Sequence, residues 1–182
     1  WICPSWDNGG CSYGSWQIES SQGTMAYFIS HLKETGSPYY NALVNAGGAA
    51  AAKRGDKKFV DAWQKLARDD PAGFEQAQYG FIRDKRYLPA ANHFTAKGFN
   101  LESRSQVVKD VIWSMAVQHG GVKTILDWIA ANPRAKSMSD HELVNLMYDQ
   151  RKRYFETKTD VPRGIIRQRT VDERRKALEQ LG

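Results

Sequence analysis

The feature that most constrains the fold is an apolar segment from Ser105 to His119, in which hydrophobic residues recur every three or four positions. Residues with this spacing share one face of an α-helix, so the stripe is wide enough to be buried against several neighbours. We therefore expect the segment to be the central helix of the core. The stripe consists of Val107, Val108, Val111, Ile112, Met115 and Ala116.

Weaker stripes with the same period predict further helices. Ser139 and Thr170 each precede a glutamate by three residues, which is the spacing of a capping box at a helix start. The small-residue run Ala46–Ala52 is expected to be a connection or a helix end. Strand patterns are nearly absent, so we predict an all-α fold with loop and short extended structure through Ile18. The helices are expected over residues 24–36, 38–47, 56–70, 71–82, 122–132 and 139–155, with a basic helix from residue 170.

Length and composition describe one folded domain, because 182 residues with 41% hydrophobic and 25% charged residues suit a single core. No apolar run approaches the roughly 18 residues of a membrane span. The net charge is +6, but the basic runs at 151–153 and 163–175 also contain, or adjoin, acidic residues, as salt-bridged surfaces do. We expect a monomeric domain over residues 1–182, with no membrane span and no nucleic-acid partner. Because the chain begins abruptly at Trp1, we also expect it to be the C-terminal part of a longer polypeptide.

The segment from Asp7 to Ile18 is the least helix-like part of the chain, and it is the part that suggests chemistry. It combines an acidic residue, glycines and hydrogen-bonding side chains without helical periodicity. Glycines allow the backbone to approach a ligand closely, and the rings of Tyr13 and Trp16 offer flat faces for stacking on sugars. On composition alone, an ordinary glycine-rich loop is an equally good interpretation.

The residues Asp7 to Gln17 spell D-x-G-G-x-S-Y-G-x-x-Q, followed by a Gly-Thr pair and an aromatic-aliphatic helix. This pattern, with 107–120 and 148–155 in the same order, resembles the lysozyme-like peptidoglycan hydrolases of phage lysins and type VI secretion spike or effector proteins, which are related to chitosanases. The resemblance implies a two-lobed lysozyme-like helical domain with a small loop or β element at its N-terminal end. It also implies that the glycan strands of peptidoglycan are the substrate, that an immunity protein is a partner, and that the protein is secreted or delivered to the periplasm of a target bacterium.

Hydrolysis of a glycosidic bond needs two carboxyl groups, one protonated to serve the leaving oxygen and one ionised to activate water or stabilise the transition state. The resemblance assigns the ionised role to Asp7. The general-acid glutamate of the family precedes this aspartate, but residues 1–6 contain no carboxylate. We expect the acid to lie before Trp1, with Glu19 as the fallback, although Glu19 could simply be a solvated carboxylate near a helix start. The residues expected to line the substrate cleft are Ser12, Tyr13, Trp16, Gln17 and His119.

Two other functions fit parts of the sequence. A cysteine amidase or peptidase of the cell wall could use Cys11 as nucleophile and His119 as base, but a disulfide between Cys3 and Cys11 explains the cysteines equally well. A lysozyme-like body without its acid would be a non-catalytic glycan-binding module. Release of reducing ends, release of free amines, or neither, would separate the three.

The remaining residues with potential chemistry suggest structural roles. The four histidines, at 31, 93, 119 and 141, do not have the spacing of metal ligands, and we predict neither a metal nor a cofactor. The rings of Trp63, Trp113 and Trp128 lie on helical stripes and are expected in the core. Trp1, Trp6 and Trp16 are therefore the better candidates for sugar platforms.

Overall fold

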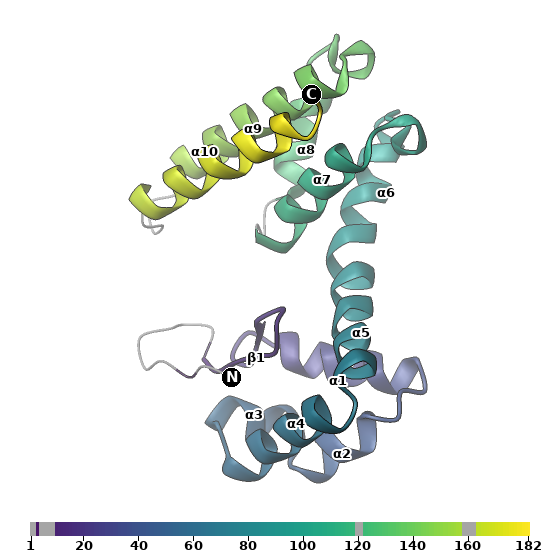
Figure 1. The fold of residues 1–182 in the computed structure, drawn as a ribbon, viewed down its shortest axis with the longest axis vertical. Helices are drawn as coiled ribbons and strands as arrows, with labels where there is room; N and C mark the ends of the chain where they lie inside the picture. The colour runs from purple at the N-terminus through teal and green to yellow at the C-terminus, as the bar shows by residue number, and fades with distance from the viewer. Residues whose placement is uncertain (1–2, 4–9, 119–121, 158–162) are drawn as a thin grey trace. The chain divides into compact units, whose positions relative to one another are not determined.

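The computed structural model describes Cys3 and residues 10–118, 122–157 and 163–182, which form helices apart from one two-stranded hairpin (Figure 1). The predominance of helix confirms the all-α prediction. The first elements are β1 (Ser12–Tyr13), β2 (Ile18–Glu19), α1 (Thr24–Glu34), α2 (Tyr40–Asn45), α3 (Gly48–Arg54), α4 (Lys57–Asp69), α5 (Pro71–Ile82) and the π-helical turn η1 (Arg83–Tyr87). They are followed by α6 (Leu88–Ala96), η2 (Leu101–Ser103), α7 (Gln106–Gln118), α8 (Val122–Ala130), η3 (Ala135–Ser137), α9 (Asp140–Glu156) and α10 (Arg163–Glu179).

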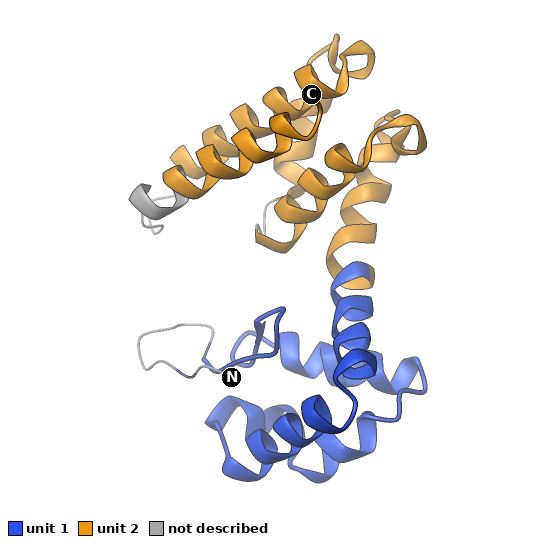
Figure 2. Cartoon of the chain, viewed as in Figure 1, with its two compact units in different colours: residues 1–83 blue, residues 84–182 orange. Residues whose placement is uncertain are grey.

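The chain, predicted as one domain, divides into two compact units. Unit 1 comprises Trp1–Arg83 and unit 2 comprises Asp84–Gly182 (Figure 2). In the part of the chain that the structure describes, no helix is long and apolar enough to cross a membrane.

In unit 1, α1 packs against α2, α3, α5 and β2, and α4 packs against α2, α3 and α5. Trp63 of α4 is at the centre, with its ring centroid 4.8 Å from that of Phe74 and 5.7 Å from that of Phe28. Only 4% of Trp63 is exposed, which confirms the prediction that it is a core residue. The most completely buried side chains of unit 1 include Met25, Leu32, Leu43, Phe59 and Phe81.

The hairpin is attached to this core by its inner face. β1 and β2 are antiparallel, with Ser12 opposite Glu19 and Tyr13 opposite Ile18. Tyr13 and Ile18 are both buried, and the Tyr13 ring lies 5.3 Å from that of Trp63. Because alternate residues of a strand point to opposite faces, the turn between the strands is held at the edge of the core.

In unit 2, α7 buries the apolar stripe predicted for it, but α9 has the central place that the sequence assigned to α7, because α9 packs against α7, α8 and α10. α6 packs against α7 and α8. Val108, Ile112 and Met115 are fully buried. Trp113 and Trp128, expected in the core from their place on helical stripes, are only half-buried, and the guanidinium of Arg153 lies 4.2 Å from the centre of the Trp128 ring.

The structure differs from the sequence prediction at three elements. The run expected as a connection or helix end at Ala46–Ala52 contributes to a helix of its own, α3. α6 was not predicted. α10 begins at Arg163, so Thr170 lies inside the helix and does not cap it, whereas the capping box between Ser139 and Glu142 is present in full.

Candidate functional site

The residues that the sequence assigned to the site divide between the hairpin and the parts that the structure does not describe. Asp7 and His119 lie outside the described residues. Glu19 and the candidates at positions 12, 13, 16 and 17 belong to one short hairpin, so the structure does bring these five together.

A disulfide between Cys3 and Cys11 joins the start of the chain to the residue just before β1. Cys11 is fully buried, and its backbone N–H donates a hydrogen bond of 3.0 Å to the Ser20 hydroxyl. The sequence segment between the two cysteines contains Asp7. Because both sulfurs are in the disulfide, Cys11 has no thiolate to offer, and the structure contradicts the alternative in which it is a nucleophile.

The inner face of the hairpin is built into the core. Tyr13 is fully buried, and its hydroxyl donates a hydrogen bond of 2.8 Å to the carbonyl oxygen of Ala52. Burial, followed by the negative charge of Asp56, raises the pKa of Tyr13 to about 12. Ser12 is 8% exposed. Tyr13 therefore holds the hairpin against the core, Ser12 is buried beside it, and the more exposed part of the hairpin is the turn that follows them.

That turn has an unusual backbone. Gln17 has a φ of 51°, and among the described residues it is the only non-glycine with a positive φ. Its backbone N–H and its side-chain Nε2 each donate a hydrogen bond of 3.2 Å to the carbonyl oxygen of Gly14. A left-handed conformation is costly for a residue with a Cβ, and such conformations are concentrated at ligand and active sites. Gln17 is exposed, and its side-chain amide is held against the turn through its Nε2.

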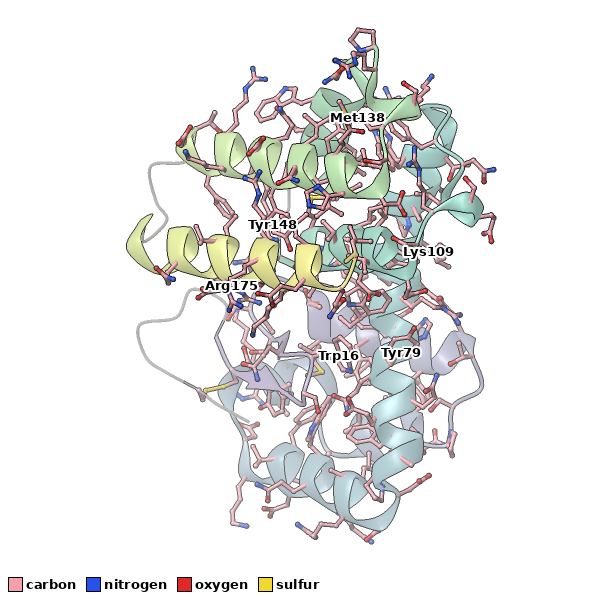
Figure 3. All side chains as sticks on the ribbon, turned by 45° about the horizontal axis from the view of Figure 1, so that its top comes forward. Trp16, Tyr79, Lys109, Met138, Tyr148 and Arg175 are labelled. Atoms are coloured by element: carbon pink, nitrogen blue, oxygen red, sulfur yellow. A yellow bond between two sulfur atoms is a disulfide. The ribbon has the colours of Figure 1, made fainter. Side chains whose placement is uncertain are left out.

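The helix α5 lies beside this turn. Ser15 Oγ donates a hydrogen bond of 2.8 Å to Oε2 of Glu75. The ring of Trp16 lies 5.9 Å from that of Tyr79, with their planes tilted by 54° (Figure 3). Glu75 and Tyr79 are four residues apart, so they share a face of α5. An aromatic pair and a carboxylate therefore meet at one edge of unit 1.

Glu19 occupies a different position on the hairpin, at the entrance to α1. Its Oε2 accepts a hydrogen bond of 3.1 Å from the backbone N–H of Gln22, and its Oε1 accepts one from the Thr24 hydroxyl. These bonds satisfy polar groups at the start of a helix that has no side-chain cap on Gly23. Glu19, the fallback candidate for the general acid, therefore stabilises the start of α1.

Unit 2 contains a second polar cluster, built around Arg151 of α9, which is 1% exposed. Its guanidinium donates to Glu173 Oε2 at 2.8 Å and to Oε1 of Gln118, and it lies 5.5 Å from the centre of the Tyr148 ring. Arg169 donates to the other Glu173 oxygen at 2.7 Å. Burial raises the pKa of Glu173, but the hydrogen bonds and charges of the two arginines outweigh it and hold that pKa below its usual value. The cluster ties α7, α9 and α10 together.

The described residues contain no group of three or more histidine, cysteine, aspartate or glutamate side chains arranged to hold a metal ion.

Residues 4–174 match the family described as the Type VI secretion system spike protein VgrG3-like, C-terminal. The chain belongs to this family. A relative, the Type VI secretion system spike protein VgrG3 of Vibrio cholerae serotype O1 (strain ATCC 39315 / El Tor Inaba N16961), is 30% identical over 145 residues. The matched region is 79% of this chain but 13% of the relative. The part of the sequence resemblance that pointed to type VI secretion spike proteins is confirmed.

In this VgrG3-like domain, sequence reasoning missed the contribution of α5 to the hairpin edge. The segment 71–82 is predicted as a core helix, and Phe74 and Phe81 confirm that role. The spacing of Glu75, Gln78 and Tyr79 places them on a common face, but only the fold shows that this face meets the turn. The partners of Arg151 were missed for a similar reason, because the local spacing of Glu173 indicates only a capping box.

Proposed function

We propose that this VgrG3-like domain hydrolyses the glycan strands of bacterial peptidoglycan, by cleaving β-1,4 bonds as lysozymes do. The lysozyme-like character of the fold is part of this proposal. Membership of a type VI secretion spike family supports delivery to a target cell, and a wall hydrolase would act in the periplasm of that cell. An immunity protein would then protect the producing cells. The +6 charge suits a monomeric enzyme that acts on a polyanionic wall.

The observation that carries the proposal is the construction of the hairpin turn. The sequence motif ends at Gln17, and Gln17 is the residue held in a left-handed conformation with its amide fixed by Gly14. The half-buried ring of Trp16 lies next to it. A rigid turn that combines an aromatic ring with oriented hydrogen-bonding groups is suited to a sugar ring, which has an apolar face and hydroxyl edges.

Asp7 is the proposed second carboxylate. It would activate the attacking water or stabilise the positive charge that develops on the sugar ring. The disulfide supports this role, since it ties the segment that carries Asp7 to the base of the hairpin. The amide oxygen of Gln17 would orient a sugar hydroxyl or the water, and His119 would line the cleft. Ser12 and Tyr13 would support the turn without touching the glycan.

The general acid is the remaining element of the mechanism. The two candidates are a glutamate that precedes Trp1 in the natural polypeptide and Glu19. An upstream glutamate in a partly apolar site would have the raised pKa that an acid catalyst needs. Glu19 is the weaker candidate, because both of its oxygens already accept hydrogen bonds at the start of α1. Glu-to-Gln substitutions at each position, made in the longer polypeptide, would distinguish them.

The decisive experiment is digestion of purified peptidoglycan with separate measurement of reducing ends and free amines. We expect reducing ends and disaccharide-peptide fragments with intact stem peptides. Asp7→Asn should lower turnover by about 10²- to 10⁴-fold, because an amide can neither act as a base nor carry the charge. Asp61→Asn, which changes an exposed aspartate paired with Lys57, is the matched control and should leave turnover unchanged.

Other results would overturn the proposal. Release of free amines alone would show an amidase or peptidase. Binding to peptidoglycan with neither product would show a glycan-binding module. Full activity of the Asp7→Asn variant would show that Asp7 is not the second catalytic carboxylate.

A further inference from the structure

The carboxylate of Glu75 lies beside the hairpin turn, where Ser15 contacts it. Ser15 Oγ donates to its Oε2 at 2.8 Å, and no ion pair to Glu75 occurs in the described part of the chain. Asp56, Asp61 and Asp69 each pair with a lysine or arginine, whereas Glu19, Glu34 and Asp70, like Glu75, accept only hydrogen bonds from the described residues. Glu75 thus presents an uncompensated negative charge and a free acceptor capacity at the hairpin edge.

This carboxylate has aromatic neighbours. Tyr79 is one helical turn along α5, and its ring is tilted by 54° to that of Trp16 at a centroid distance of 5.9 Å (Figure 3). Both rings are half-buried. Aromatic rings favour the apolar C–H face of a sugar, whereas a carboxylate favours its hydroxyl and amide N–H donors.

The edge is also rigid. Gln78, on the same face of α5, is 3% exposed, and its Nε2 donates to the carbonyl oxygen of Phe74 at 3.2 Å. Its Oε1 lies directly under Gly14, where even one additional carbon atom would not fit. The contact between Gly14 and Gln78 therefore sets the distance of the turn from α5. The Ser15–Glu75 hydrogen bond limits the movement of the turn across the helix. Preorganised groups lose little conformational entropy when they bind a ligand.

We propose that Glu75 and Tyr79, with Ser15 and Trp16, form a subsite for an uncharged N-acetylated amino sugar, so that an N-acetylglucosamine residue of the strand lies against α5. Glu75 would accept hydrogen bonds from the hydroxyl or acetamido N–H groups of that sugar. The same negative charge would disfavour N-acetylmuramic acid, whose lactyl group carries a carboxylate or an acidic peptide. The choice of a peptidoglycan sugar as the ligand rests on the function proposed above.

The subsite can be tested by binding, without reference to catalysis. Chitotetraose, a neutral oligomer of N-acetylglucosamine, is titrated into the full chain by calorimetry. Glu75→Gln should weaken binding about tenfold, as expected for the loss of a hydrogen bond to a charged group. Tyr79→Ala should weaken it about fivefold, as expected for the loss of an aromatic contact.

The chain offers matched controls. Ser30 donates to Glu34 on α1 at 3.1 Å, which is a second serine–glutamate pair in the same unit. Glu34→Gln should therefore bind chitotetraose as the wild type does, and so should Tyr40→Ala. Ser15→Ala removes the hydrogen bond but keeps the carboxylate, so it should weaken binding less than Glu75→Gln does. Thermal melting of each variant shows that the fold is retained.

Selectivity gives a readout that a purely structural role of Glu75 would not change. The wild type should prefer chitotetraose over a tetrasaccharide of alternating N-acetylglucosamine and N-acetylmuramic acid with free lactyl carboxylates. In the Glu75→Gln variant this preference should fall about fourfold, which is the effect of one charge at about 5 Å in water. Failure of the wild type to bind chitotetraose, or equal affinity and preference in wild type and variant, would overturn the subsite.

Hydrolysis is scored separately, so that the two proposals can fail independently. Binding of chitotetraose that depends on Glu75, without release of reducing ends from peptidoglycan, would retain the subsite and refute the hydrolase. Release of reducing ends with the same KM in wild type and Glu75→Gln would retain the hydrolase and refute the subsite.

Discussion

Oε1 of Gln78 lies 1.9 Å from the position that a Cβ atom on residue 14 would occupy, so the hairpin turn and α5 approach each other as closely as glycine allows. Gly14 also has a φ of 71°, which disfavours any residue with a Cβ. Because Gln78 is almost completely buried and bonded to Phe74, its side chain has little freedom to move away. The contact sets the position of Ser15 and Trp16.

Gly14→Ala should therefore destabilise the protein by about 3 kcal/mol, since a left-handed backbone and an overpacked contact both oppose the new Cβ. Gly36→Ala is the matched control. Gly36 has a φ of 64°, but no atom lies within 4 Å of the place where its Cβ would stand, so only the backbone cost of about 1 kcal/mol applies. Urea unfolding of both variants measures the difference. Equal losses of unfolding free energy in the two variants would show that the Gln78 side chain can move aside at little cost.

The helices that were predicted differ from the helix that was missed in how clear their apolar stripe is. The stripe through Val108 and Ile112 identified α7 because a helix with one apolar face must bury that face. α6 was missed because its buried residues are mainly small alanines, which give only a weak apolar stripe.

The edge of the hairpin could be predicted only in part. The motif identified Trp16 and Gln17 from residue types alone. It could not identify Glu75 or Tyr79, because their contact with the turn joins segments some 60 positions apart. The motif also assigned Tyr13 to the ligand site, because a tyrosine suits a sugar platform as well as a core. Only its contacts with the rings of Phe59 and Trp63 show that it packs in the core.

The disulfide leads to a prediction about redox conditions. Cys3 and Cys11 are eight positions apart, and closing so short a loop stabilises the folded state by about 2.5 kcal/mol. Cys3 is exposed, so reductants have access to the bond. Dithiothreitol should lower the free energy of unfolding by about that amount. It should have no effect on a Cys3→Ser/Cys11→Ser double variant, which should match the reduced wild type. A stability unchanged by reduction would show that other contacts hold the start of β1.

The last prediction concerns Arg151 and Glu173 in unit 2. Glu173→Gln removes a carboxylate that pairs with the guanidinium of Arg151, which is 1% exposed. Removing one partner of a buried ion pair is costly, so the variant should lose about 3 kcal/mol at neutral pH. Glu179→Gln is the control, because Glu179 forms an exposed pair with Arg175 and such pairs contribute less than about 1 kcal/mol.

The pH dependence distinguishes a charge effect from a change of shape. The pKa of Glu173 in the folded protein is held below its usual value, so its contribution to stability is complete above the unfolded pKa of about 4.5 and is lost as the pH falls through the folded pKa. The difference in unfolding free energy between wild type and Glu173→Gln should thus be constant from neutral pH to about pH 5.5 and shrink below about pH 4.5. Urea unfolding across this range measures it. A difference that stays the same in acid would mean that the glutamine disturbs the packing of α7, α9 and α10, and that the arginine–carboxylate charge pair contributes little.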